Sequence, residues 1–107
     1  MKKNEIIKKG NDFSYIINNG KFVKDKFISI YYIKSKDNLF GISVPKKYGN
    51  AVSRNKIKRQ VKNIIDKNKF NIKKEYDYVI ILKSPLKKLK FNEIEKKLME
   101  KFLKIKD

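Results

Sequence analysis

The spacing of the apolar residues switches between helical and strand periods along this chain, and that order limits the folds open to it. In some segments apolar side chains recur every three or four residues, and in others they alternate with polar ones or run together. The predicted elements, in order, are a helix over 11–20, strands within 22–33 and over 39–44, a long helix over 50–68, a strand over 78–82 and a helix over 91–105. This order predicts a mixed α+β sandwich in which one sheet is covered by helices.

The long helix has the clearest division between a buried and an exposed face. Asn50 is its candidate N-cap. At 100° per residue, a buried stripe within about 80° of its first member is predicted for Ile57, Val61, Ile64 and Ile65. The opposite face is predicted to carry Asn55, Arg59, Lys62 and Asp66. The last helix is predicted to begin with Asn92 and Glu95 as its cap pair.

The balance of charge narrows the class of partner. The 107 residues contain 29 Lys and Arg against 11 Asp and Glu, which gives a formal net charge of +18. A chain of this length is expected to form a single domain over residues 1–107. Its charge favours polyanions, with nucleic acid as the first candidate and an anionic membrane surface as the second. No apolar run approaches the roughly 20 residues of a membrane span, and no signal peptide is recognisable, so we expect a soluble, cytoplasmic protein.

The residue types that are missing restrict the chemistry. The chain has no cysteine, which excludes disulfides and thiolate metal sites, and no histidine, which removes the commonest general base. The carboxylates are scattered, with no pair that the sequence places on one helix face. We therefore predict no catalytic side chain and no metal site in the protein itself.

Arginine is almost absent from this very basic chain. Of its 29 Lys and Arg residues only Arg54 and Arg59 are arginines, and both fall within six residues of the long helix. A guanidinium grips phosphate or a base edge through two parallel hydrogen bonds, or stacks on a ring, and an ammonium can do neither. We therefore predict that the functional surface includes this segment.

The surroundings of the two arginines favour binding to a phosphate backbone. Asn55, Arg59 and Lys62 recur at i, i+4 and i+7, and the free amides at the helix start add to the positive potential. Further basic residues flank this stripe or precede it in the loop: Lys46, Lys47, Lys56 and Lys58. The alternative is an ordinary solvated basic helix face.

Residues 46–62 resemble the signature of the bacterial ribonuclease P protein component. In that motif an alanine stands three residues before an Arg-Asn pair, which is followed by basic, aliphatic, basic and Arg positions. Ala51, Arg54-Asn55 and the segment Lys56-Ile57-Lys58-Arg59 fill every one of them. The resemblance continues over nearly the whole chain, from the basic start before Phe13 to the last helix.

The resemblance implies a fold and a site. The family has a two-layer α+β sandwich with a four-stranded mixed sheet in the order α-β-β-β-α-β-α, similar to a domain of a small-subunit ribosomal protein, with a left-handed βαβ crossover. RNA contact is implied for Lys46, Lys47, Asn50, Arg54, Asn55, Lys56, Lys58, Arg59 and Lys62. A cleft for the 5′ leader of precursor tRNA is implied at Phe13, Ile17 and Tyr31. Often the family has an aromatic residue at the position of Ile17 and an arginine at that of Lys56.

The resemblance also implies a reaction. The protein would be the subunit of an RNA-based endonuclease that removes the leader and leaves a 5′ phosphate. Its partners would be one catalytic RNA and precursor tRNA, with no membrane and no required protein partner. Mg²⁺ would be held mainly by the RNA, and no organic cofactor is expected.

Other interpretations of the residues remain open. A small basic ribosomal protein would share the size and the charge, although it needs neither a leader cleft nor this motif. A membrane-active cationic protein would explain the amphipathic last helix but not the aromatic strands. Without the resemblance, Phe13 and Tyr31 are ordinary core candidates.

Overall fold

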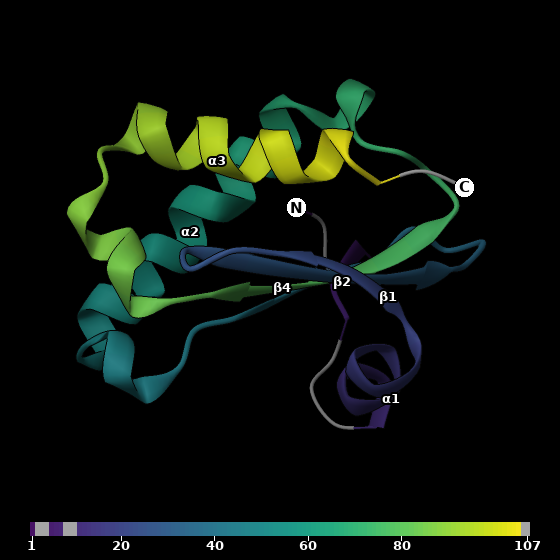
Figure 1. Cartoon of the computed structure of the whole chain (residues 1–107), viewed down its shortest axis with the longest axis horizontal. Coiled ribbons are helices and arrows are strands. Elements are labelled where there is room, and N and C mark those ends of the chain that lie inside the picture. The colour runs from purple at the N-terminus through teal and green to yellow at the C-terminus, as the bar shows by residue number, and fades with distance from the viewer. Residues whose placement is uncertain (2–4, 8–10, 106–107) are drawn as a thin grey trace.

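The computed structural model describes residues 1, 5–7 and 11–105, which form one sheet with helices on both of its faces (Figure 1). The helices are α1 (Asn11–Asn19), α2 (Ala51–Lys67) and α3 (Phe91–Leu103), and the strands are β1 (Lys21–Lys24), β2 (Ile28–Lys34), β3 (Phe40–Ser43) and β4 (Tyr76–Leu82). Short 3₁₀ turns occur at η2 (Lys46–Tyr48), η3 (Lys69–Asn71) and η4 (Ser84–Lys88). Within the described residues no helix combines the length and the apolar character that crossing a membrane requires.

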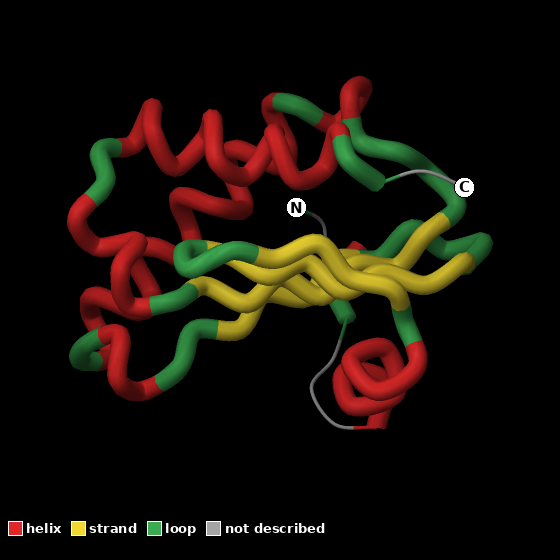
Figure 2. The backbone as a smooth tube through the Cα atoms, in the orientation of Figure 1, coloured by secondary structure: helices red, strands yellow, loops and turns green. Residues whose placement is uncertain are grey.

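The sheet is mixed, with the strand order β1-β2-β4-β3. β2 pairs antiparallel with both β1 and β4, whereas β3 and β4 are parallel. Figure 2 shows the strands as one twisted layer with helices on both sides. A parallel pair needs a long crossover, and α2 lies in the connection between β3 and β4. The predicted α+β class, mixed four-stranded sheet and element order are confirmed; the left hand of the crossover stays a prediction.

The segment within which strands are predicted, 22–33, forms a hairpin that turns at Asp25. The Oδ1 atom of Asp25 accepts hydrogen bonds from the N–H groups of Phe27, at 2.7 Å, and Ile28, at 3.0 Å. An aspartate that bonds the backbone two or three residues ahead forms a local turn. The turn separates β1 from β2 and places Phe22 directly opposite Tyr31.

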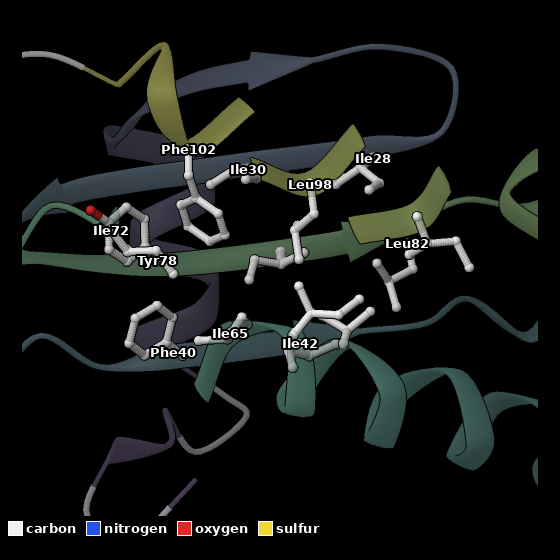
Figure 3. Close-up of a cluster of buried hydrophobic side chains, with 14 of the residues drawn as sticks. Ile28, Ile30, Phe40, Ile42, Ile65, Ile72, Tyr78, Leu82, Leu98 and Phe102 are labelled. Atoms are coloured by element: carbon white, nitrogen blue, oxygen red, sulfur yellow. The ribbon is translucent and has the colours of Figure 1, made fainter. Parts of the chain in front are cut away.

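One face of the sheet holds the larger core, beneath α2 and α3. Side chains at alternate positions of β2 and β4, among them Ile30 and Tyr78, pack there against Ile65 of α2 and Leu98 and Phe102 of α3 (Figure 3). The stripe predicted for α2 is confirmed, since Ile57, Val61, Ile64 and Ile65 are all buried. This packing fixes α2 by one side and leaves its other side to solvent.

The opposite face of the sheet is covered by α1. Ile16 of α1 and Val79 of β4 are buried there together with Ile7, and Tyr31 and Ile33 of β2 pack around them. β2 is therefore apolar on both faces, because α1 lies on one side and α2 with α3 on the other (Figure 1). Beyond α1 this face remains partly open.

The predicted cap of the last helix was wrong. α3 begins at Phe91, so the N-cap is Lys90, whose N–H donates to Glu93 Oε1 at 2.9 Å. Glu95 instead accepts a hydrogen bond from the side chain of Asn68 at 2.9 Å and so ties α3 to the end of α2. Two acidic residues stand two positions apart in this sequence, and the tertiary contact decides which one caps the helix.

Candidate RNA-binding surface

The start of α2 is fixed by Asn50. This residue has an extended backbone, and its Oδ1 accepts from the N–H of Ser53 at 2.9 Å, while its own carbonyl accepts from the N–H of Arg54 at 3.0 Å. The predicted N-cap is confirmed. The side-chain oxygen of Asn50 is thus engaged in capping, and the RNA contact proposed for this residue is left to its amide group.

The residues predicted to bind RNA differ in exposure along α2 and the turn before it. Asn50, Lys46 and Lys47 are exposed ahead of the helix. On the helix itself the exposed members are Asn55, Lys56 and Arg59. The half-buried members are Arg54, Lys58 and Lys62. None of the nine is fully buried, so the structure leaves each of them accessible to a large ligand.

Lys58 and Lys62 meet the first helix in a small pocket of about 160 Å³, which we call the cleft pocket. Its lining comprises Met1, Ile6, Ile7, Phe13, Phe40, Ile42, Lys58 and Lys62. The pocket therefore joins one flank of α2 to the ring of Phe13 on α1. Two predicted RNA contacts, Lys58 and Lys62, thus share a cavity with one predicted leader-cleft residue, Phe13. Ile17 and Tyr31 do not line it.

Arg54 carries a buried donor whose acceptor is not found among the described residues. The side chain is half-buried, and its Nε atom is shielded from solvent without a hydrogen-bond partner there. A buried donor left unpaired is costly, on the order of 1–3 kcal/mol. The Arg54 Nε donor is therefore a candidate to bond an acceptor atom of a bound ligand.

The three residues predicted for the leader cleft lie together beside the smaller core, which is the buried cluster between α1 and the sheet. Phe13, Ile17 and Tyr31 pack against the buried cluster of Ile7, Ile16 and Val79 and each stays partly exposed. Phe13 is held by a close approach to the sheet, because a Cβ atom added to Gly41 would lie 2.6 Å from its Cε2 atom. The core and cleft interpretations of these side chains are thus compatible, since one edge packs and the other faces out.

Comparisons with known proteins identify the family of this chain. The family model described as Ribonuclease P matches residues 1–106. The ribonuclease P protein component of Macrococcus caseolyticus is 44% identical over 101 residues, which are 92% of this chain and 87% of that protein. The corresponding component of Streptococcus pneumoniae is 39% identical over 102 residues, covering 92% of this chain and 82% of that protein. The chain belongs to the ribonuclease P protein family.

Solved structures of this family share the fold. The ribonuclease P protein of Thermotoga maritima matches with a TM-score of 0.88 at 29% identity, covering 96% of this chain and 99% of that chain. The Staphylococcus aureus protein matches with a TM-score of 0.82 at 35% identity, covering 92% of each. Membership places the chain in tRNA processing, with ribonuclease P RNA as its partner, and sets aside the ribosomal alternative.

Phe22 was missed in the sequence and stands beside the leader cleft. Its ring is 54% exposed, and its centroid lies 5.8 Å from that of Tyr31 across the β1–β2 pair. The Nζ atom of Lys24 lies 5.0 Å from the centroid of the Phe22 ring. Only the register of the hairpin brings Phe22 opposite Tyr31. A prediction of the turn at Asp25 from the sequence would therefore have indicated that Phe22 lies beside the cleft. An aromatic ring is thus supplied near the cleft although Ile17 provides none.

Asp25 and Glu95 have structural roles, because each bonds a side chain of another element. Within the described residues no group of three or more acidic side chains is placed to hold a metal ion. Asp25 bonds Lys101, and Glu95 accepts from Asn68 and Lys67. The pKa of Glu95 is lowered by the hydrogen bond from Asn68 first and by that from Lys67 second, both of which favour the ionised form. These acids stabilise contacts between elements on the side of the sheet that carries α2 and α3.

Proposed function

We propose that this chain, as the protein subunit of ribonuclease P, binds the catalytic RNA through α2 and holds the 5′ leader of precursor tRNA on the neighbouring sheet face. The observation that carries the proposal is the cleft pocket, where Phe13 of α1 meets Lys58 and Lys62 of α2. One RNA strand lying there would reach both predicted surfaces. The protein would therefore act as a bridge between catalyst and substrate, in the cytoplasm and without a required protein partner.

The catalytic RNA is assigned to the solvent side of α2 and the turn before it. Asn55 and Arg59 are exposed one helical turn apart, so both can face one RNA backbone. Arg54 offers a buried Nε donor that a phosphate oxygen would satisfy. A surface of this length, on one helix, is expected to accept one RNA molecule per protein.

The leader is assigned to the rings beside the smaller core. Single strands are held by stacking on aromatic rings within a basic groove. Phe13 and Tyr31 offer partly exposed rings, and Phe22 extends them to the edge of the sheet, where Lys24 lies over its face. Lys58 and Lys62 provide charge on the α2 side of the same cleft. Mature tRNA lacks the leader, so this face distinguishes precursor from product.

The chemistry is assigned to the RNA. When bound, Mg²⁺ would activate the attacking water and stabilise the leaving oxygen. Water attacks the phosphorus, the bond to the 3′ oxygen of the leader breaks, and the phosphate stays on the tRNA 5′ end. We expect its ligands to come mainly from the RNA; within the described residues no group of three or more acidic side chains fits this ion. The side chains of this protein bind and orient the leader and transfer no proton in the reaction.

The description of one related protein mentions a second activity, the degradation of mRNA. One Staphylococcus aureus relative, 34% identical with a TM-score of 0.83, is described as a ribonuclease P protein mutant with defective mRNA degradation activity. This chain has neither His nor Cys, and these are the residues that would most readily act as acid, base or nucleophile in a protein ribonuclease. We therefore expect the RNA-free protein to cleave neither mRNA nor precursor tRNA.

Reconstitution tests the proposal. The purified protein with its cognate ribonuclease P RNA and Mg²⁺ is expected to convert precursor tRNA to a product with the mature 5′ phosphate. The protein freed of RNA by nuclease treatment and denaturing purification, assayed on the same substrate and on an mRNA, is the control. Site-specific cleavage by that RNA-free protein would place the chemistry in its side chains and reject the proposal.

A further inference from the structure

A second and larger pocket of about 380 Å³ lies on the other flank of α2, where η2, η4 and the start of α3 meet it. We call it the α3 pocket. Its floor is apolar, since Tyr48, Ile57, Leu86 and Ile94 line it and each is at most 5% exposed. Above this floor the accessible lining is more polar than apolar, and the volume falls within the roughly 300–1,000 Å³ of ligand sites, so the pocket suits one nucleotide. The roles assigned above use none of these four side chains.

The rim of the α3 pocket complements a nucleotide. Lys56 and Lys87 are exposed cations on its edge, and Phe91, which is 43% exposed, presents an aromatic ring beside them. Ser53 and Gln60 add hydroxyl and amide groups that can bond a base edge. A ring for stacking, cations for phosphate and polar groups for the base are the parts that single-stranded RNA recognition uses.

Lys87 lies over the mouth of the α3 pocket. Its Nζ atom lies 5.2 Å from the centroid of the Tyr48 ring. It also lies 3.0 Å from the point where a Cβ atom at Gly49 would stand, so the glycine admits this close approach. The lysine therefore joins η4 to the turn that precedes α2 and keeps its charge over the pocket.

The two flanks of α2 are separate sites. Lys58 and Lys62 line the cleft pocket with Phe13, whereas Lys56 and Gln60 line the α3 pocket with Phe91. Asn55 and Arg59 lie between the two flanks on the exposed face of the helix. An RNA bound along that face would pass the mouth of the α3 pocket.

We infer that the α3 pocket receives one unpaired nucleotide of ribonuclease P RNA, its base stacked on Phe91 and its phosphate beside Lys56 and Lys87. The inference rests on the proposed binding of that RNA along α2. It adds an RNA contact on the flank of α2 that faces η4 and α3. This contact would recognise an unpaired base, whereas the lysines alone recognise only the charge of the RNA backbone.

A single tryptophan reports on this pocket, because the natural chain contains none. Phe91→Trp places an indole at the rim, and Phe70→Trp, at a position that is 97% exposed on η3, is the matched control. On titration with cognate ribonuclease P RNA, stacking is expected to quench the emission of the Phe91→Trp protein and to leave that of the Phe70→Trp protein nearly unchanged. Adding Lys87→Ala to the Phe91→Trp protein is expected to weaken the quenching.

Affinity gives the second measurement. Phe91→Ala is expected to raise the Kd for the RNA by roughly five- to 150-fold, the range for loss of one stacked base, while circular dichroism stays that of the folded protein. Phe91→Leu, which keeps an apolar side chain, should show most of the same loss. RNA that binds the Phe91→Trp protein with unchanged emission, or that quenches the Phe91→Trp and Phe70→Trp proteins equally, would overturn the inference. So would quenching by free ATP with none by the RNA.

The cleavage assay tests the proposed function independently of the fluorescence measurement. Wild-type protein that fails to support cleavage by the RNA would reject that function. The fluorescence result depends on RNA binding alone and keeps its meaning in either case.

Discussion

Lys101 of α3 donates a hydrogen bond to Asp25, the residue that forms the turn between β1 and β2. In a chain rich in exposed lysines this one is only 4% exposed, and it fixes α3 over the hairpin. Lys83 adds to the contact by donating to the backbone carbonyl of Asp25 at 2.6 Å. The geometry of the β1–β2 hairpin thus depends on a contact with the end of the chain, 76 residues away.

Asp25→Asn is expected to destabilise the protein by about 1–3 kcal/mol, because it leaves the buried Lys101 ammonium without its counter-charge. The value lies below that of a fully buried pair, since the Asp25 side chain is 36% exposed. Urea unfolding at neutral pH measures the loss. Glu75→Gln, at the exposed pair with Lys34, is the control and is expected to change stability by under about 1 kcal/mol. Equal losses in both variants would contradict the structural role of Asp25.

The same pair predicts a dependence on pH. Burial alone would raise the pKa of Asp25, but hydrogen bonds from Lys101 and from the Ile28 and Phe27 N–H groups outweigh it, so the pKa is lowered from 3.8. A lowered folded-state pKa stabilises the protein above the unfolded value, and that stability is lost as pH falls through the folded value. The difference in unfolding free energy between wild type and Asp25→Asn is therefore expected to be full at pH 6 and to shrink below about pH 4. A difference that grows on acidification would contradict the lowered pKa.

Gly41→Ala tests the placement of Phe13. The new methyl group would lie 2.6 Å from the Phe13 ring, so the ring must move, at a cost of about 1–3 kcal/mol. Gly49→Ala is the matched control, because its nearest neighbour is the flexible end of Lys87 and its backbone, at φ 160°, is extended. Urea unfolding of both variants gives the comparison. We expect a loss at Gly41 alone; a Gly41→Ala protein as stable as wild type would show that Phe13 does not pack there.

The helical elements could be predicted well because their periodicity is local. The stripe of Ile57, Val61, Ile64 and Ile65 follows from one period repeated along α2, and the cap at Asn50 needs only the next three residues. The motif in residues 46–62 is also a local pattern, recognisable from consecutive residues. The motif residues on α2 lie on the faces of the helix that its period of about 3.6 residues predicts.

Features set by contacts between distant segments could not be predicted in this way. The turn at Asp25 is reinforced by Lys101 and Lys83, which lie far away in the sequence. The local pattern therefore predicts strands within 22–33 but does not place the boundary between them. Phe22 joins Tyr31 only through the register that this turn creates. Because β2 is apolar on both faces, its sequence does not tell which helix covers which side.

Aromatic truncation tests the leader cleft. Phe13→Ala, Tyr31→Ala and Phe22→Ala are each expected to weaken precursor tRNA binding by the holoenzyme by about 1–3 kcal/mol, the range for one stacked base. Binding of mature tRNA should hardly change, because it has no leader to stack. Phe22→Ala is the most informative of the three, since its exposed ring contributes least to the core. Equal losses for precursor and mature tRNA would return these residues to a purely structural role.

Arg59→Lys tests whether the two arginines are retained for their geometry. The change keeps the net charge at +18, and Lys and Arg have nearly equal helix propensity, so an exposed position on α2 should fold as before. A guanidinium offers five donors in one plane, whereas an ammonium is a strongly hydrated point charge. Loss of a bidentate contact is expected to cost about 1–3 kcal/mol in affinity for the catalytic RNA.

Lys104→Ala is the control for Arg59→Lys. Lys104 is exposed at the end of α3, and its removal deletes a whole charge. Both variants must be titrated at one fixed salt concentration, because counterion release makes every such affinity steeply dependent on salt. We expect the larger loss from Arg59→Lys although it changes no charge. If Lys104→Ala binds worse while Arg59→Lys matches wild type, net charge alone governs binding and the placement of the arginines carries no function.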